Sequence, residues 1–223
     1  MDREIIFRDL GKMEYAEAWE YQEKLFQAII DAKQNNTASP NYLLFCEHPH
    51  VYTLGKSGSD TNLLLNQKSL EEKGATFFRT NRGGDITYHG PGQIVGYPIL
   101  NLETFNLGIR NYIELLEESI IGLLKNYHIQ AGRLDGASGV WLDAGTPGAR
   151  KICAIGVRSS RFVTMHGFAF NVNTNLDYFS YINPCGFVDK GVTSMQKELD
   201  KKLDFEHIKH ELKEIILDML SKA

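Results

Sequence analysis

The 223-residue sequence predicts an α+β fold, with residues 1–223 forming a single domain in which helices pack on a mixed sheet. Two observations support this class. Three long segments carry apolar residues at steps of three and four, which is typical of amphipathic helices. Short apolar segments lie between them, but helices do not separate these segments regularly, which argues against a doubly wound parallel sheet. No repeat or low-complexity linker divides the chain.

The first predicted helix spans residues 12–33, where Tyr15, Trp19 and Ile29 fall on one face. The second spans residues 109–127 and has the same apolar spacing. The third begins at Asp204, a side chain suited to cap a helix N-terminus, and extends to about Leu220. All three should bury one side against a sheet.

Strands are predicted where short runs are rich in β-branched and aromatic residues. These runs are residues 42–46, 76–79, 94–100, 139–142, 151–157 and 162–172. Residues 47–66 are rich in Gly, Pro, Ser and Asn and are predicted to form a long loop. Residues 143–148 are predicted to form the loop of a hairpin.

The composition excludes several classes of protein. The net charge of −4 argues against a general nucleic-acid binder. No apolar run reaches the length of a membrane-spanning helix, and no apolar signal core follows the first residues, so we expect a cytoplasmic protein. The three cysteines have no metal-ligand spacing and are expected to be free thiols; neither a metal nor a cofactor is predicted.

Residues 82–93 are unusually rich in glycine and include one proline. Such a backbone can approach a ligand closely. The segment lacks the Gly-Lys-Ser/Thr ending of a phosphate-binding loop and the glycine spacing of a dinucleotide-binding turn. A purely structural series of turns is the alternative interpretation.

The three cysteines have different settings. Cys46 lies in an apolar run and is expected in the core. Strand alternation is expected to place Lys151, Cys153 and Ile155 on one face. Cys185 lies between a proline and a glycine in a predicted loop, where a thiol is more often exposed and reactive. Cys185 is therefore a candidate nucleophile, and an inert turn cysteine is the alternative.

A nucleophilic thiol needs a neighbouring group that favours its thiolate form. Lys151, at the start of a strand after a loop, is one candidate; His89 and His166 are others. His166 is equally well interpreted as a hydrogen-bonded core residue. His48 and His50 resemble a metal-binding pair only weakly, because no third ligand is spaced near them.

Residues 144–176 contain no acidic residue but contain Arg150, Lys151, Arg158 and Arg161. This run indicates either a solvated basic face or a docking surface for an acidic partner. Strand alternation separates Lys151 from Arg158, so Arg161 is the better candidate for such a contact.

Several motifs, in order, resemble the octanoyltransferase family of lipoate biosynthesis. They are residues 82–93, 96–100, 151–158, 166–172, 183–186 and 192–194, and the resemblance covers roughly residues 4–200. It implies a fold shared with biotin- and lipoate-protein ligases. It also implies transfer of an octanoyl group from octanoyl-acyl carrier protein to a lysine of lipoyl domains, in E2 subunits of 2-oxoacid dehydrogenases and in the glycine cleavage H protein.

The resemblance assigns Cys185 as the acyl-thioester nucleophile and Lys151 as its partner. It also implies an acyl-binding site made by Arg82, Gly83, Gly84, Asp85, Ile86, Thr87, Tyr88, His89, Ala154, Ile155, Gly156, Gly167, Phe168 and Ala169. Residues 144–149 form a longer loop than is usual in the family, which bears on where Lys151 lies. The apolar segments 94–100 and 166–172 predict a pocket for a medium-length acyl chain.

Two alternative functions are considered. An ATP-dependent lipoate-protein ligase has the same fold and needs no cysteine. A non-catalytic acyl-binding module would hold the acyl chain without forming a covalent bond. Moving an acyl group from a thioester to a thioester and then to an amide is downhill and needs no ATP. The Pro-Cys-Gly loop and the His-Gly-Pro-Gly-Gln run favour the transferase.

Overall fold

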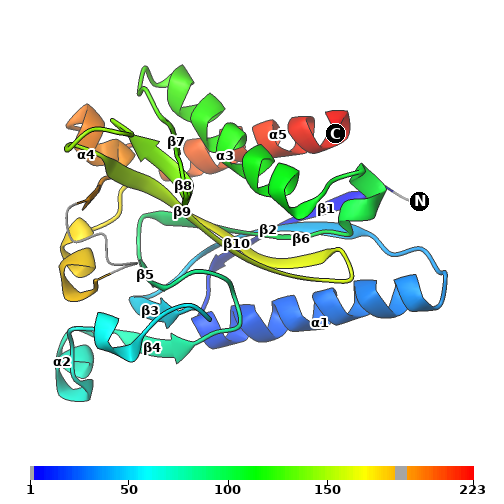
Figure 1. Cartoon of the computed structure of the whole chain (residues 1–223), viewed down its shortest axis with the longest axis horizontal. Helices are drawn as coiled ribbons and strands as arrows, with labels where there is room; N and C mark the ends of the chain where they lie inside the picture. The colour runs from blue at the N-terminus through cyan, green and yellow to red at the C-terminus, as the bar shows by residue number, and fades with distance from the viewer. Residues whose placement is uncertain (1–2, 184–189) are drawn as a thin grey trace.

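The computed structural model describes residues 3–183 and 190–223, and within them it has the predicted α+β fold built on a mixed sheet. The larger sheet has the order β1-β2-β6-β10-β9-β8-β7, with β11 added beside β9 (Figure 1). Its strands are β1 (Ile5–Lys12), β2 (Asn41–Glu47), β6 (Gln93–Ile99), β10 (Val163–Asn171), β9 (Arg150–Ser160), β8 (Ala137–Leu142), β7 (Gly132–Leu134) and β11 (Gly191–Val192). The β1–β2 and β11–β9 pairs are parallel and the other pairs are antiparallel.

A smaller sheet packs beside the first and has the order β4-β3-β5. Its strands are β4 (Thr76–Arg79), β3 (Val51–Leu54) and β5 (Ile86–His89). The short helices α2 (Gln67–Glu72) and η3 (Leu176–Tyr181) lie near it. An aromatic core joins these elements, and it includes Tyr52, Tyr88 and Tyr178.

Three long helices cover the two faces of the larger sheet. Helix α1 (Tyr15–Gln34) lies along one face, and α3 (Ile109–Asn126) and α5 (Phe205–Lys222) lie on the other (Figure 1). Each face has its own apolar core, one packed against α1 and a larger one against α3 and α5. Strand β10 is buried along its whole length, so it forms the centre of this three-layer arrangement.

The predicted helices are confirmed with small differences at their ends. The first begins at Tyr15 rather than residue 12, because Lys12 ends strand β1. At the third, the Asp204 side chain accepts a hydrogen bond from His207 N at 3.1 Å, as expected for an N-cap. The third helix continues to Lys222, two residues beyond the predicted end.

The prediction of one long loop over residues 47–66 is wrong. This segment contains β3, whose four residues are all buried, and the short helix η1 (Asp60–Asn62). The flanking glycines and serines concealed a strand that is short and buried on both sides. Strand β5 was likewise concealed inside the glycine-rich segment.

Among the residues that the structure describes, no helix is both long and apolar enough to span a membrane.

Candidate active site

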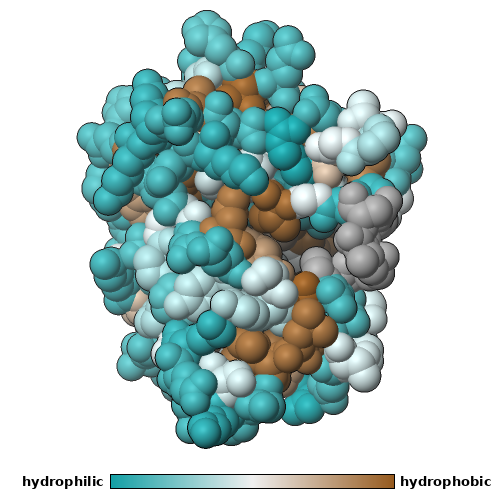
Figure 2. All heavy atoms as spheres, turned by 90° about the vertical axis from the view of Figure 1, so that its left-hand side faces the viewer, coloured by the Kyte–Doolittle hydropathy of each residue, from teal (hydrophilic) through white to brown (hydrophobic). Residues whose placement is uncertain are grey.

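A cavity of about 640 Å³ opens between strands β9 and β10 and the glycine-rich segment. Figure 2 views the molecule from this side and shows apolar side chains gathered in a hollow. Its lining includes most of the residues singled out from the sequence: Arg82, Gly83, Gly84, Asp85, Ile86, Thr87, His89, Lys151, Ala154, Ile155, Gly156, Gly167, Phe168 and Ala169. The fold thus brings three separate motifs to one concave site.

Tyr88 is not part of this lining. Its ring lies in the aromatic core of the smaller sheet, stacked on Tyr178 with ring centroids 5.0 Å apart. Its hydroxyl is hydrogen-bonded to Nδ1 of His50 at 2.7 Å. Tyr88 therefore secures η3, the short helix that precedes residue 183, instead of facing the cavity.

The glycine-rich segment is held by backbone hydrogen bonds on both sides. Gly83 N donates to Val157 O at 2.9 Å, which fixes the segment to the part of β9 that β8 leaves unpaired. A Cβ at Gly55, which follows β3, would lie 2.3 Å from the carbonyl oxygen of Gly84. Only glycine allows this close approach, so the backbone itself forms one wall of the cavity.

A continuous series of buried polar groups connects the glycine-rich segment to strand β10. The Arg82 guanidinium donates to Thr53 Oγ1 at 2.9 Å, and the Thr53 hydroxyl is in turn hydrogen-bonded to His89 Nε2 at 3.3 Å. His89 Nδ1 contacts Gln93 Oε1 at 3.0 Å, and Gln93 Nε2 donates to Asn171 Oδ1 at 2.9 Å. Burial lowers the pKa of His89 well below its ordinary value, so the ring is neutral and receives the Thr53 proton.

The same network continues to Lys151. Asn171 Nδ2 donates to Thr193 O at 3.0 Å, and Thr193 N donates to Lys151 O at 2.9 Å. Strand β11 pairs with the start of β9, where Gly191 N donates to Ala149 O at 3.0 Å. The backbone of Lys151 is therefore fixed from the strand that follows residue 190.

Cys185 lies outside the described residues. Described residues on either side of 184–189 lie at or near the cavity. Asn183 N donates to Asn62 O at 2.8 Å, and Lys190 lines the cavity itself.

The two described cysteines, Cys46 and Cys153, are buried, and burial makes their thiols unreactive. Burial raises the pKa of Cys46 to about 12, and burial likewise raises the pKa of Cys153. The expectation that Cys153 shares a strand face with Lys151 is wrong. Val140 pairs with Cys153 but its neighbour Trp141 pairs with Lys151, so Ile152 is an extra residue in a β-bulge. The bulge turns Lys151 to the cavity and Cys153 to the core.

A second group of buried rings contains Tyr15, Tyr97 and His89, which line the cavity, and His48, which packs against Tyr97 and His89. His48 Nδ1 donates to Met13 O at 2.7 Å, so its Nε2 accepts from the Tyr97 hydroxyl at 2.6 Å. The ring of Tyr15 is stacked on that of His89 with centroids 6.0 Å apart. Burial lowers the pKa of His48 to about 4 and raises that of Tyr97 well above its usual value. These rings are neutral at physiological pH and orient one another.

His166 has an unusual backbone. Its φ is 58°, in the left-handed region, in the middle of strand β10. Its Nε2 is hydrogen-bonded to Asn81 Oδ1 at 2.6 Å, and its backbone N donates to Gln22 Oε1 at 3.0 Å. Burial, with Arg82 and Arg158 nearby, lowers the pKa of His166 to about 3. The residue is both a hydrogen-bonded core histidine and part of the cavity lining.

The basic run over residues 144–176 is contiguous in sequence but not in space. Arg150 forms ion pairs with Asp143 and, at 2.6 Å, with Glu198, both outside the run. Arg158 pairs with Glu23 of α1 at 3.1 Å. Arg161 lies in the β9–β10 turn, at the far end of an 11-residue strand that extends roughly 35 Å. A single docking surface made of these cations does not form.

Sequence reasoning missed other parts of the lining, among them Tyr15, Ile113 and Trp141. These residues sit in apolar runs, where an aromatic or aliphatic side chain resembles an ordinary core residue. Only their meeting in three dimensions reveals them.

Within residues 3–183 and 190–223, no group of three or more His, Cys, Asp or Glu side chains is placed to hold a metal ion. His48 and His50 use ring nitrogens in hydrogen bonds to Tyr97 and Tyr88.

The fold is similar to that of protein ligases for lipoate and biotin. Lipoate-protein ligase A bound with ATP matches 99% of this chain and 86% of its own, with a TM-score of 0.69 and 13% identity. Biotin protein ligase from Aquifex aeolicus covers 100% of this chain and 71% of its own, with a TM-score of 0.51 and 14% identity. At such low identity these similarities establish the fold alone.

The family follows from sequence. The model of the lipoyl protein ligase A/B catalytic domain matches residues 14–217, and the chain belongs to this family. An octanoyltransferase of Bacteroides fragilis (strain YCH46) is 56% identical, covering 97% of this chain and 99% of its own. An octanoyltransferase of Flavobacterium johnsoniae is 58% identical, and the match covers 95% of this chain and 94% of its own.

Proposed function

We propose that residues 1–223 form one catalytic domain that transfers an octanoyl group from octanoyl-acyl carrier protein to a lysine of lipoyl domains. The acceptors are E2 subunits of 2-oxoacid dehydrogenases and the glycine cleavage H protein, and the reaction takes place in the cytoplasm. The observation that carries the proposal is the cavity that joins Lys151, the glycine-rich segment and β9–β10. The octanoyltransferases that match nearly the whole chain support it.

The reaction proceeds through an acyl-thioester on Cys185. Lys151 takes the thiol proton, and the thiolate attacks the carbonyl carbon of the donor thioester. The new bond joins Cys185 Sγ to the acyl carbon, the bond to the carrier sulfur breaks, and the carrier thiol leaves with the proton. Two described residues support this placement. Asn183, which precedes Cys185 in the chain, donates its backbone N–H to Asn62 O, and Lys190, which follows it, lines the cavity.

The second half of the reaction forms an amide. The acceptor lysine, as a neutral amine, attacks the Cys185 thioester, Lys151 accepts the amine proton, and the Cys185 thiol is regenerated. Backbone N–H groups of the glycine-rich segment are suited to stabilise the oxyanion of each tetrahedral intermediate. Dividing the transfer in this way means that the two protein substrates need not bind together.

The acyl chain is proposed to lie against β9 and β10. Ala154 and Ala169 have small side chains there, which leaves room beside the backbone. At Gly156 and Gly167, by contrast, neighbouring backbone fills the space: a Cβ would lie 3.0 Å from Gly83 O and 2.2 Å from Gly96 O, respectively. The buried rings of Tyr15 and Tyr97 line the same cavity and are proposed to limit the length of chain that it accepts. Each buried methylene contributes about 0.8 kcal/mol, so affinity should rise with chain length until the cavity is filled.

The direct test is the intact mass of the protein after incubation with octanoyl-acyl carrier protein in the absence of ATP. The proposal expects one octanoyl group on wild-type protein, none on Cys185→Ser, and passage of the label to H protein on addition. An activity that requires ATP and free octanoate would instead identify a lipoate-protein ligase. Binding of the acyl chain without any covalent adduct would identify a non-catalytic acyl-binding module.

A further inference from the structure

We infer that Trp141 is a positioning residue for Lys151, whose ammonium group rests on the face of the indole ring. The Nζ atom of Lys151 lies 4.6 Å from the centroid of the Trp141 ring. Both residues line the cavity, and Trp141 is only 2% exposed. A cation over the face of tryptophan is attracted by the negative charge of its π system, and the attraction is stronger where water is excluded.

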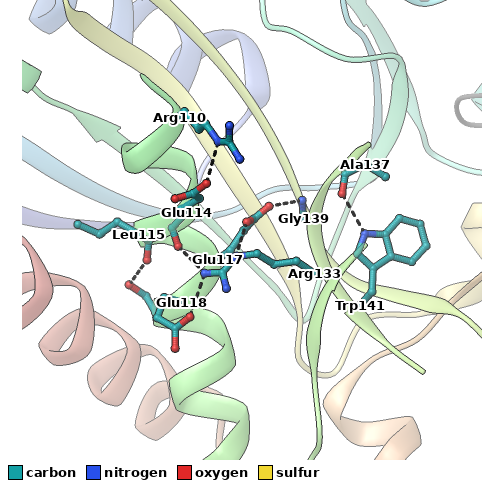
Figure 3. Close-up of polar contacts among 10 residues, drawn as sticks. Arg110, Glu114, Leu115, Glu117, Glu118, Arg133, Ala137, Gly139 and Trp141 are labelled. Carbon is teal, nitrogen blue, oxygen red and sulfur yellow. Dashed lines mark hydrogen bonds and ion pairs between the residues drawn. The ribbon is translucent and has the colours of Figure 1, made fainter. Parts of the chain in front are cut away.

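The indole ring is itself held in place. Its Nε1–H donates to the carbonyl oxygen of Ala137 at 3.3 Å, which ties the ring to the start of its own strand (Figure 3). Trp141 and Lys151 are also directly paired across β8 and β9. Paired residues of antiparallel strands lie on the same face of the sheet, so ring and ammonium are brought together by backbone register.

The register depends on a contact from helix α3. The buried carboxylate of Glu117 accepts a hydrogen bond from Gly139 N at 2.9 Å and pairs with Arg133 Nε at 2.9 Å (Figure 3). Gly139 has a φ of 114°, and a Cβ there would lie 2.4 Å from the carbonyl oxygen of Cys153. Glu117 thus fixes a backbone conformation that only glycine adopts, directly before the β-bulge that turns Lys151 to the cavity.

The ring has a predictable chemical effect. It stabilises the protonated form of Lys151 relative to the neutral amine, since only the cation is attracted to the indole face. A stable ammonium in turn favours the thiolate of a neighbouring cysteine. Removing the ring should therefore lower the pKa of the Lys151 amine and raise the pKa of the Cys185 thiol.

The test measures the pKa of the Lys151 amine. The intact protein is treated with acetic anhydride at a series of pH values, and the rate at which Lys151 is acetylated is then determined by mass spectrometry of its peptides. In Trp141→Leu we expect the pKa of Lys151 to fall by about one unit, or ~1.4 kcal/mol. In Trp141→Phe, whose ring is smaller, we expect a lesser fall. Alkylation of Cys185 near pH 7 should slow by up to about tenfold in the Leu variant.

Val140→Ala is the matched control. Val140 precedes Trp141 on β8 and is fully buried. Its side chain, like that of Cys153, lies in the apolar core packed against α3 and α5 and not in the cavity lining. Its truncation loosens the same strand without touching the ammonium, so the pKa of Lys151 should stay unchanged. An equal fall in Val140→Ala, or no fall in Trp141→Phe and Trp141→Leu, would overturn the inference. If the Leu variant does not fold, the Phe variant decides the question.

The inference rests on the proposed function in that Lys151 serves the transfer and, for the alkylation readout, in that Cys185 lies beside Lys151. The two fail separately. An active Lys151→Ala protein would refute the role of the lysine in transfer and leave the pKa measurement standing. An unchanged pKa of Lys151 in the tryptophan variants would refute the positioning role and leave the transfer intact.

Discussion

The side-chain amide of Gln93 donates to Asn171 Oδ1 at 2.9 Å and links strands β6 and β10 at the end nearest the cavity. Gln93 is 1% exposed, and it also contacts His89 Nδ1 and the carbonyl oxygen of Tyr88. One buried amide thereby joins the glycine-rich segment to strand β10, which pairs with β9 along its other edge. Loss of that amide should disturb both stability and activity.

We therefore expect Gln93→Ala to destabilise the fold by at least about 3 kcal/mol, because three buried polar groups lose their partner and each unsatisfied group costs about 1–3 kcal/mol. Transfer activity should fall with it. Urea unfolding measures the first effect and steady-state turnover the second. Gln67→Ala removes a comparable amide contact on the surface of α2, to Glu71, and should change stability by less than about 0.5 kcal/mol. Equal stability of the two variants would contradict the network's importance.

Cys185→Ser is expected to abolish transfer, while Cys46→Ser and Cys153→Ala stay active. Burial raises the pKa of both described thiols, and Cys153 faces the core on the opposite side of β9 from Lys151. The measurement is octanoyl transfer to H protein by mass spectrometry. Near wild-type turnover in Cys185→Ser would rule out the covalent mechanism.

Lys151→Ala should leave a folded but nearly inactive protein, and Lys151→Arg should be little better. Arginine remains a cation and can still favour the thiolate, but it cannot accept a proton. Thiol alkylation against pH reports the first property and turnover the second. Robust turnover in the arginine variant would show that charge alone suffices and that Lys151 is not a base.

Gly96→Ala should shorten the preferred acyl chain. A Cβ at Gly96 would lie 2.2 Å from the Phe168 ring, and that ring lines the cavity. The ring must move, and the space available to the acyl chain changes with it. We expect KM to rise more for octanoyl than for hexanoyl donors, measured as a series of thioesters. A uniform loss of activity at every chain length would mean that Phe168 does not bound the acyl site.

Stability should fall as the pH drops below 6.5. Burial lowers the pKa of His48 in the fold to about 4, below its ordinary 6.5, so protonation favours the unfolded chain. The stabilisation is fully present above pH 6.5 and is lost toward pH 4, by about 1.4 kcal/mol per pH unit. Urea unfolding at pH 7.5 and 5.0 measures the difference.

His48→Gln should reduce that pH difference by about 2 kcal/mol, whatever its effect on absolute stability. His210→Gln, an exposed substitution on α5, is the control and should leave the difference unchanged. His166, with a pKa of about 3 in the fold, accounts for part of the remaining slope. An identical pH difference in wild type and His48→Gln would contradict the assignment.

The long helices could be predicted because their apolar spacing extends over many turns, as in α3 and α5. Strand β1 was not predicted, since it is an edge strand with half its residues exposed. Strands β3 and β5 were missed because each has only four residues and lies among glycines. Short elements gain their stability from pairing and burial, and the local sequence carries little of that information.

The candidate site was predicted in outline, through motifs that the fold brings to one cavity. The face of Cys153 was predicted wrongly, because alternation of side chains fails at a β-bulge and Ile152 gives no local signal of one. Tyr88 was placed in the site although its side chain points into the aromatic core. Within a strand, adjacent residues such as Tyr88 and His89 face opposite sides of the sheet. A sequence motif contains both residues and does not indicate which of them faces the site.

The order of strands in the larger sheet has a consequence for the growing polypeptide. Strand β6, buried at every position, lies between β2 and β10, and Gly96 pairs with Phe168, about seventy residues later in the chain. While the chain leaves the ribosome, β6 can join β2 early, but its other edge stays open until β10 has been synthesised. An apolar strand with an open edge invites pairing with other chains. Nascent chains that stop before residue 171 should therefore be the ones that need chaperones most.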